Sequence, residues 1–241
     1  EEYIVGPEVG INYYLQDGDI VLSAMHDRYM IEGNGKHPRL PLAYIYPSKY
    51  LDLYMKHEDK LVIDMFRSIN MKNGTLFMQG CLKENEVLFY EMGYRLNGAK
   101  QYQIIANETL VNPMHAIVNF SLKGNMGDDN LALEINPRFK NTYCTLSILV
   151  HPGRIDRIVG LSELQKRNDL LITQWLRAGD FLDDSALGTQ KQIAMRITIY
   201  AEDHKSLATK INNVYDVLEI YDVNGNSMIF ERFDTELLFE S

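Results

Sequence analysis

The sequence predicts an α+β fold, with strands and helices mixed in both halves of the chain. Segments rich in β-branched and aromatic residues are interleaved with segments whose apolar residues recur at helical intervals. Residues 75–92 have the pattern of a β-hairpin around a polar turn. The 241-residue chain is 46% hydrophobic and 24% charged, which is ordinary globular composition and excludes disordered and fibrous proteins.

In the first half, strands are predicted on either side of the turn Gln16-Asp17-Gly18, and a long irregular segment rich in glycine and proline follows them. A helix is then predicted, ending before Asn73-Gly74, followed by the hairpin and by a second helical region that is interrupted near Asn112-Pro113. In order, the predicted segments are strands 3–14 and 19–25, the loop 27–48, helix 49–72, hairpin strands 75–82 and 87–92, and helix 99–123.

The second half is predicted to be a separate unit. Residues 124–130 form a polar linker with two glycines, so we expect one domain over 1–126 and another over 131–241. Asp203 is a candidate N-cap for a helix. The predicted elements are strands 131–135, 143–150, 154–159, 193–200 and 217–222, helix 204–215, and a last strand 227–230 after a turn.

Charge and composition limit the function. The formal charge of −9 and the isoelectric point near 5.2 argue against a nucleic-acid surface, although a nucleotide site needs only a few local cations and a metal. No window approaches the ~18 uninterrupted apolar residues of a membrane span, and no signal-like segment opens the sequence. For Cys81 and Cys144 we favour two buried thiols in a reducing cytosol over a single bridge.

The segment with the most chemical information is the hairpin. Gln79 lies on its first strand, Glu91 at the end of its second, and Arg95 four residues further on. The turn between the strands can bring Gln79 and Glu91 to one face. Magnesium prefers oxygen ligands, and the guanidinium fork suits phosphate. On this pattern alone, however, a solvated sheet edge is the commoner explanation.

Other residues make the hairpin more informative. The chain opens Glu1-Glu2-Tyr3-Ile4, and Glu8 follows Glu1 by seven positions, after Gly6-Pro7. Together with the hairpin and the helix after it, this pattern resembles the ATP-grasp superfamily over residues 1–125, with the metal hairpin of carbamoyl phosphate synthetase and biotin carboxylase. More loosely, the segment 151–155, Gly160-Leu161, Gly179-Asp180 and the segment 204–225 resemble the C-terminal domain of biotin carboxylase and amino-acid ligases.

The resemblance implies roles in nucleotide binding near the start of the chain. The carboxylate of Glu1 and the carbonyl of Glu2 would face the adenine amino group, while the backbone N–H of Ile4 would donate to a ring nitrogen. Tyr3 would help form the purine pocket, and Glu8 would accept from the ribose hydroxyls.

The resemblance also implies the metal and phosphoryl chemistry. Gln79 and Glu91 would bind Mg²⁺, and Arg95 would stabilise the transferred phosphoryl group or the resulting acyl-phosphate. The superfamily usually has an Asn two residues after the bridging Glu, where this chain has Gly93. Because glycine lacks a ligand atom, two-metal chemistry is in doubt. A non-catalytic module that kept the fold is therefore the alternative function.

Two alternatives stay open at the level of the sequence. Glu134, Asn136 and Arg138 read like the motif from which the segment 91–95 departs, and we interpret them as part of a strand entering the second domain. Basic residues between His26 and Arg39 are candidate phosphate contacts, or simply belong to a surface loop.

The resemblance implies an ATP-dependent carboxylate-amine ligase that uses ATP and Mg²⁺ on a small carboxylate and an amine. We expect a cytoplasmic protein without nucleic-acid or membrane partners, and residues 131–241 are a candidate dimerising or partner-binding domain. We expect the family's substrate domain and lid half to precede Glu1, so that this polypeptide alone turns over poorly or not at all.

Overall fold

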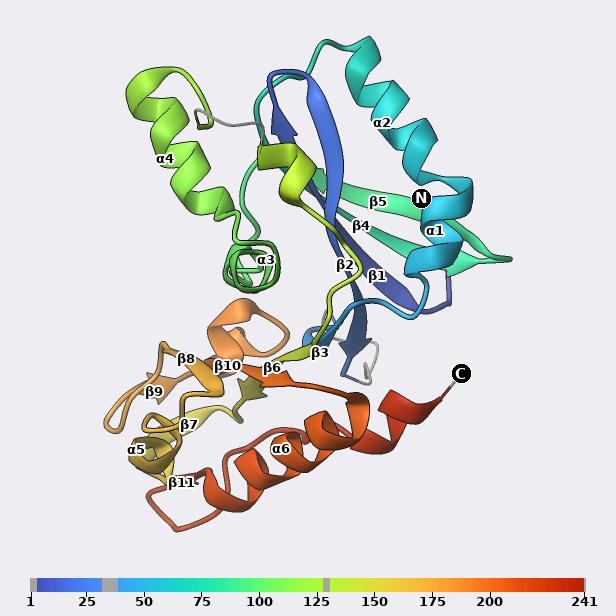
Figure 1. Cartoon of the computed structure of the whole chain (residues 1–241). Coiled ribbons are helices and arrows are strands. Elements are labelled where there is room, and N and C mark those ends of the chain that lie inside the picture. Colours follow the sequence, from blue (N-terminus) through green and yellow to red (C-terminus); the bar gives the residue numbers. More distant parts are fainter. Residues whose placement is uncertain (1–3, 32–38, 128–130, 241) are drawn as a thin grey trace. The chain divides into compact units, whose positions relative to one another are not determined.

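The computed structural model describes residues 4–31, 39–127 and 131–240 (Figure 1). The chain forms two compact units, of residues 1–27 with 46–140 and of residues 28–45 with 141–241. This division differs from the expected domains in two ways. The chain passes between the units after Lys140 rather than at 124–130, and the segment 28–45 belongs with the second unit because its strand pairs there.

The first unit is built on four strands in the order β5-β4-β1-β2, with β4 antiparallel to both of its neighbours. Strand β2 continues by three residues into the second unit. The elements are β1 Glu8–Gln16, β2 Asp19–Met30, α1 Leu51–His57, α2 Asp59–Ser68, β4 Gly74–Lys83, β5 Glu86–Gly93, α3 Tyr102–Thr109, α4 Pro113–Lys123 and the 3₁₀ turn Leu131–Glu134.

Alternation along β1 gives this sheet two different faces. Ile11, Tyr13 and Leu15 pack with α1 and α2 in one apolar core. Tyr14 points the other way, into a smaller cluster that includes Val111 before α4. Figure 1 shows the helices on both sides of these strands. One face of the sheet is therefore committed to the main core, and the other carries the polar residues described below.

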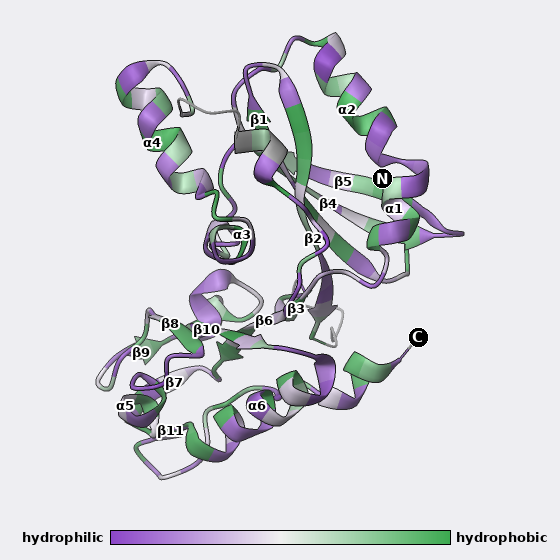
Figure 2. Ribbon diagram, viewed as in Figure 1, coloured by the Kyte–Doolittle hydropathy of each residue, from purple (hydrophilic) through white to green (hydrophobic). Residues whose placement is uncertain are grey.

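The second unit has a sheet in the order β3-β6-β10-β8, in which β10 is antiparallel to β6 and β8. A small sheet, β11-β7-β9, accompanies it. Helix α6 contributes Leu207, Ile211 and Val214 to the core, and Figure 2 shows green apolar bands on its ribbon. The elements are β3 Pro41–Tyr46, β6 Thr142–Leu149, β7 Gly153–Val159, α5 Leu161–Leu164, β8 Leu170–Gln174, β9 Phe181–Leu182, β10 Ile193–Ala201, α6 His204–Val217, β11 Glu219–Asp222 and 3₁₀ turns at Asp184–Ala186, Gln190–Gln192 and Thr235–Phe239.

Several predicted elements are confirmed with shifted ends: the β4–β5 hairpin, the interrupted helix of α3 and α4, the strands β6, β7, β10 and β11, and α6. Asn112 caps α4 by accepting from the backbone N–H groups of Met114 and His115. Asp203 caps α6 in a capping box with Ser206. These signals are local, so they can be read from the sequence.

Other predictions were wrong. The loop 27–48 contains the end of β2 and all of β3, whose six residues are buried. The helix 49–72 is two helices that meet at Glu58. The segment 131–135 is a 3₁₀ turn rather than a strand. Residues 227–230 form only isolated bridges, and β8 and β9 were not expected. Among the described helices, none is long and apolar enough to cross a membrane.

Candidate functional site

The polar face of the first unit is organised by β4. Gln79 lies directly opposite Glu91 on β5 and opposite Gly10 on β1. Residues directly opposite each other in an antiparallel pair leave the sheet on the same side, with Cβ atoms about 4.5–5.5 Å apart. Gln79 and Glu91 therefore present an amide and a carboxylate to one space. Glu91 is exposed and Gln79 half-buried, so both are within reach of solvent ions.

Arg95 lies at one end of this row. Its guanidinium carbon stands 4.6 Å from the ring centroid of Phe77, which is two residues from Gln79 and so on the same face. The side chain is exposed, and its Nη1 also donates to the carbonyl of Leu96 at 3.1 Å. Stacking on the buried Phe77 ring restricts the Arg95 side chain and holds its positive charge at this end of the row.

Glu8 and Ile4 lie at the other end. Glu8 is opposite Cys81, which is two residues from Gln79 on the other side. Its Oε2 accepts from the Tyr90 hydroxyl at 3.0 Å. The Ile4 carbonyl is 4.0 Å from the Cys81 sulfur. The predicted residues that the structure describes therefore lie in the order Ile4 and Glu8, then Gln79 and Glu91, then Arg95. Predicted Glu1, Glu2 and Tyr3 lie outside the described residues, as do Lys36 and His37.

Gly93 lies directly opposite Phe77, and its lack of a side chain has a clear steric reason. A Cβ at this position would meet the Phe77 ring at 2.2 Å from Cε1. Real Cβ atoms do not approach that closely, so the ring takes the space that a side chain at position 93 would need. A metal-binding Asn cannot stand here unless the ring moves.

His26 belongs to the same face, and the sequence did not single it out sharply. A Cβ on Gly10 would lie 2.2 Å from Cε1 and Nε2 of the imidazole, so glycine makes the room that the ring occupies. The ring is 2% exposed and lies 4.7 Å from that of Tyr46. Of the two alternatives left open for His26, the surface loop is wrong, because β2 continues through this position. The row across the sheet is therefore Glu91, Gln79, Gly10 and His26.

Two buried amides also escaped the sequence analysis. Asn12 is opposite Phe77 on the same face, and its Nδ2 has no hydrogen-bond partner among the described residues. Gln101, just before α3, is 2% exposed, and neither of its amide atoms has a partner among them. No sequence signal marks such groups, because their burial is set by segments distant in the chain. A bound ligand is one way to satisfy a buried amide.

The competing motif of Glu134, Asn136 and Arg138 has structural partners of its own. Arg138 Nη2 forms an ion pair of 2.7 Å with Asp52 of α1, and Nε donates to the same oxygen at 3.1 Å. The Asn136 side-chain oxygen accepts from the Arg138 backbone N–H at 3.0 Å. Glu134 is exposed at the end of its 3₁₀ turn. These contacts hold the loop against α1. They account for Asn136 and Arg138 without any bound ligand.

The donor set on the hairpin fits one magnesium ion. Mg²⁺ commonly takes one or two protein oxygens and completes its shell with phosphate and water. Gln79 and Glu91 can supply those two oxygens. Among the described residues, no group of three or more His, Cys, Asp or Glu side chains could hold a metal. With Phe77 filling the space at Gly93, the residues present do not fit a second ion on the same protein ligands.

No protein-family model and no curated protein matches this chain. Solved structures do. L-amino acid ligase from Bacillus licheniformis is 19% identical, with a TM-score of 0.73 over 91% of this chain and 55% of that one. Phosphoribosylglycinamide synthetase from Anaerococcus prevotii is 16% identical, with a TM-score of 0.72 over 92% of this chain and 55% of that one.

A third match is the biotin carboxylase domain of 2-oxoglutarate carboxylase from Hydrogenobacter thermophilus, a dimer in complex with MgADP, ADP and bicarbonate. It is 14% identical, with a TM-score of 0.70 over 95% of this chain and 48% of that one. The chain thus spans about half the length of the structures it matches. It has the α+β fold of that part of the ATP-grasp ligases, as the resemblance of its motifs implied.

Proposed function

We propose that this chain is the MgATP-binding part of an ATP-dependent carboxylate-amine ligase, with the polar row of β4 as its nucleotide site. In this proposal residues 1–126 correspond in sequence to part of the ATP-grasp domain, and residues 131–241 to a domain like the C-terminal one of biotin carboxylase. These sequence bounds are distinct from those of the two compact units, which are defined by contacts. Glu1, Glu2, Tyr3 and Ile4 hold the adenine end, and Glu8 accepts from the ribose. The substrates are a small carboxylate and an amine.

The observation that carries the proposal is the order of side chains along one strand face. Cys81 is four positions after Phe77, a span of about 13 Å along a strand. Over that span, Glu8 lies at one end, the oxygen donors Gln79 and Glu91 in the middle, and Arg95 at the other end. An extended nucleotide triphosphate needs this sequence of contacts, from ribose through a bridging cation to the terminal phosphate.

Each residue has a defined task in this proposal. Gln79 and Glu91 hold Mg²⁺, and the ion, when bound, neutralises charge on the phosphates. Arg95 faces the transferred phosphoryl group and the acyl-phosphate that forms as the substrate carboxylate attacks the terminal phosphorus and ADP leaves. His26 borders the row, with its ring over Gly10, the residue opposite Gln79. The amine then displaces phosphate from the acyl group.

The contact between Gly93 and Phe77 favours a second candidate function. A site limited to one ion can bind nucleotide without transferring phosphate, which would make the chain a non-catalytic nucleotide-binding module. The two functions differ in one measurable product. An active site forms ADP when its carboxylate is present, whereas a binding module holds MgATP unchanged.

The experiment measures ADP formation with MgATP, a panel of amino acids and other small carboxylates, and hydroxylamine, which traps acyl-phosphates as hydroxamates. We expect carboxylate-dependent ADP and hydroxamate from the longer ligase that contains this chain, and little or none from the 241-residue chain alone. In the longer protein, Glu91→Ala should lower the activity roughly a hundredfold or more. Glu86→Gln, an exposed change on the same strand, is the matched control and should keep the activity. MgATP binding without ADP would establish the binding module instead. The absence of both binding and turnover would contradict both functions.

A further inference from the structure

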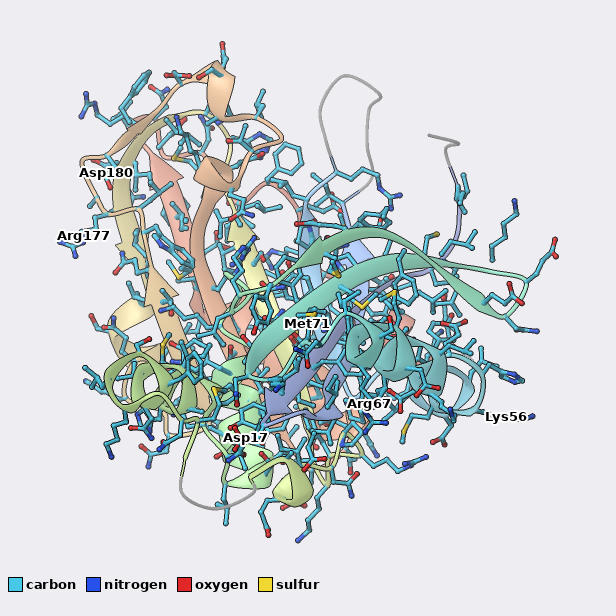
Figure 3. All side chains as sticks on the ribbon, turned by 90° about the horizontal axis from the view of Figure 1, so that it is seen from above. Asp17, Lys56, Arg67, Met71, Arg177 and Asp180 are labelled. Carbon is cyan, nitrogen blue, oxygen red and sulfur yellow. The ribbon has the colours of Figure 1, made fainter. Side chains whose placement is uncertain are left out.

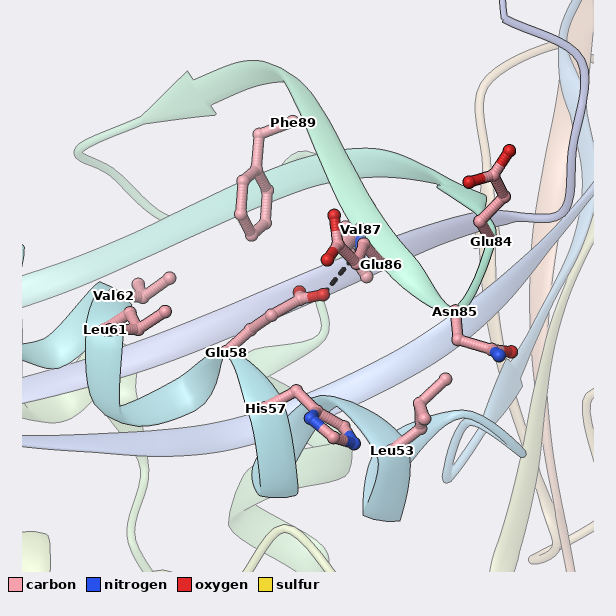
Figure 4. Close-up of a pocket in the computed structure, with 10 residues that line it drawn as sticks. All are labelled: Leu53, His57, Glu58, Leu61, Val62, Glu84, Asn85, Glu86, Val87 and Phe89. Atoms are coloured by element: carbon pink, nitrogen blue, oxygen red, sulfur yellow. Dashed lines mark hydrogen bonds between the residues drawn. The ribbon is translucent and has the colours of Figure 1, made fainter.

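Figure 4 shows a cavity of about 550 Å³. Its residues Val87 and Phe89 pair with Leu82 and Gly80, so the cavity lies on the opposite face of the sheet from Gln79 and Glu91. It forms where the junction of α1 and α2 meets the tip of the β4–β5 hairpin. Its volume is in the range of small-molecule sites, about 300–1,000 Å³. The residues that line it are Leu53, His57, Glu58, Leu61, Val62, Glu84, Asn85, Glu86, Val87 and Phe89.

The lining combines apolar walls with one sign of charge. Leu53, Leu61, Val62, Val87 and Phe89 supply the apolar surface, and Leu61 is 67% exposed. Of the ten lining residues three are glutamates, and none is a lysine or arginine. Apolar walls beside carboxylates suit a ligand that has an apolar body and a positive group.

Glu58 is the lining residue with an unmet hydrogen-bonding need. Its Oε1 accepts from the backbone N–H of Val87 at 2.7 Å, the contact dashed in Figure 4. Its Oε2 is buried and has no hydrogen-bond partner among the described residues. Burial raises the pKa of this carboxyl, because the charged form loses hydration there. Because Oε2 is closed to solvent, a donor group in the cavity reaches it only when the carboxylate turns toward the cavity. That contact would supply the missing partner and offset the loss of hydration.

We infer that this cavity binds a small organic cation, an ammonium or guanidinium group carried on an apolar body. The positive group lies beside Glu58, with Glu84 and Glu86 adding to the field at the hairpin tip. The apolar body packs against Leu61 and Phe89. The site is on the other face of the sheet from the proposed nucleotide site and uses none of its residues, so the inference stands apart from the proposed function.

The test titrates the ¹⁵N-labelled chain with three probes of matched shape: phenethylamine, 2-phenylethanol and 3-phenylpropanoate. Binding is followed by the shifts of the Val87 backbone amide and the Asn85 side-chain amide. We expect the ammonium probe to bind at least about tenfold more tightly than the alcohol, because charge-assisted hydrogen bonds are about twice as strong as neutral ones. The carboxylate probe should bind most weakly.

Variants assign the binding to this cavity. Glu58→Gln keeps an oxygen for the Val87 amide and removes the charge, so it should weaken the ammonium probe about tenfold and leave the alcohol unchanged. Leu61→Ser should weaken both probes. Leu122→Ser is the matched control, since Leu122 is 78% exposed on α4 and outside the cavity. If Glu58→Gln unfolds the chain, the exposed Glu86→Gln should still lower the preference for the ammonium probe.

Three results would overturn the inference. One is equal affinity for the ammonium and alcohol probes. The second is unchanged affinity in folded Glu58→Gln. The third is a set of shifts centred away from Val87 and Asn85. Saturation by all three probes only at very high concentration, without discrimination, would show an adventitious additive only and counts against the site.

Discussion

At the scale of single residues, the contact between Gly93 and Phe77 defines what the hairpin can hold. The ring occupies the space above the glycine and at the same time supports the guanidinium of Arg95. Phe77 thus excludes the Asn that the family resemblance would place at position 93, and the same ring supports Arg95. Restoring the Asn therefore requires a second change, at position 77.

We predict that Gly93→Asn destabilises the chain by about 1–3 kcal/mol, the usual range for forcing extra atoms into a packed site. Urea denaturation measures the change in the free energy of unfolding. Gly98→Asn is the matched control, because a Cβ at Gly98 meets nothing within 4 Å. Combining Gly93→Asn with Phe77→Leu should recover part of the loss, since the two residues are in contact. Wild-type stability of Gly93→Asn would contradict the steric account.

At the scale of elements, the sequence predicted what is decided locally. The β4–β5 hairpin follows from its alternating strands and polar turn, in which Glu84 and Asn85 adopt positive φ values of 52° and 70°. The turn alone would place Gln79 opposite Tyr90. A β-bulge at Tyr90 shifts the register between Gln79 and Gly80, and this puts Glu91 opposite Gln79, a shift that no sequence signal marks. The start of α6 followed from Asp203 as a predicted N-cap, and the interruption before α4 followed from Asn112-Pro113. Both side chains, of Asp203 and Asn112, accept backbone N–H bonds.

The elements that the sequence missed depend on distant partners. Strand β3 begins with a proline and shows no alternation of apolar and polar residues. The alternation is missing because the strand is buried on both faces, and it pairs with β6, about a hundred residues later. Strand β8 forms against β10. Strand β9 follows a turn in which Asp180 accepts from the backbone of Arg177 at 2.7 Å, and both residues are labelled in Figure 3. The burial of the His26 and Gln101 side chains is also set by distant segments, so the sequence did not reveal it.

An ion-pair network joins the start of β8 to α6 and gives an element-scale prediction. Asp169 accepts from Arg167 at 2.9 and 3.0 Å and forms an ion pair with Lys210 at 3.0 Å. Hydrogen bonds from Arg167, followed by those from Lys210, hold the pKa of Asp169 well below its ordinary value. The side chain is 25% exposed, so solvent screens only part of this interaction.

We predict that Asp169→Asn lowers the free energy of unfolding by about 1–2 kcal/mol at pH 7. Because the folded-state pKa is depressed, the stabilisation is complete above the unfolded value of about 3.9 and is lost as the pH falls toward the folded value. The difference between wild type and variant should therefore shrink below about pH 4. Asp156→Asn, whose carboxylate pairs with the adjacent Arg157, is the control. A difference that is constant with pH would contradict this assignment.

At the scale of the whole molecule, the fold and the site support each other. The fold matches ATP-grasp ligases over 91–95% of this chain at identities of 14–19%, which is too distant to carry an activity by itself. The proposed nucleotide site rests instead on the order of Glu8, Gln79, Glu91 and Arg95 along one face. The central claim is that this face binds a nucleotide through a divalent ion.

That claim is tested most directly by replacing Mg²⁺ with Mn²⁺, which broadens the NMR signals of nearby amides. With ATP and a small amount of Mn²⁺, we predict that broadening is strongest at Gln79 and Glu91, reaches Gly10 and leaves Leu122 sharp. Glu91→Gln should remove the effect, and Glu86→Gln should keep it. Broadening centred elsewhere in the chain, or broadening that survives Glu91→Gln, would contradict the account.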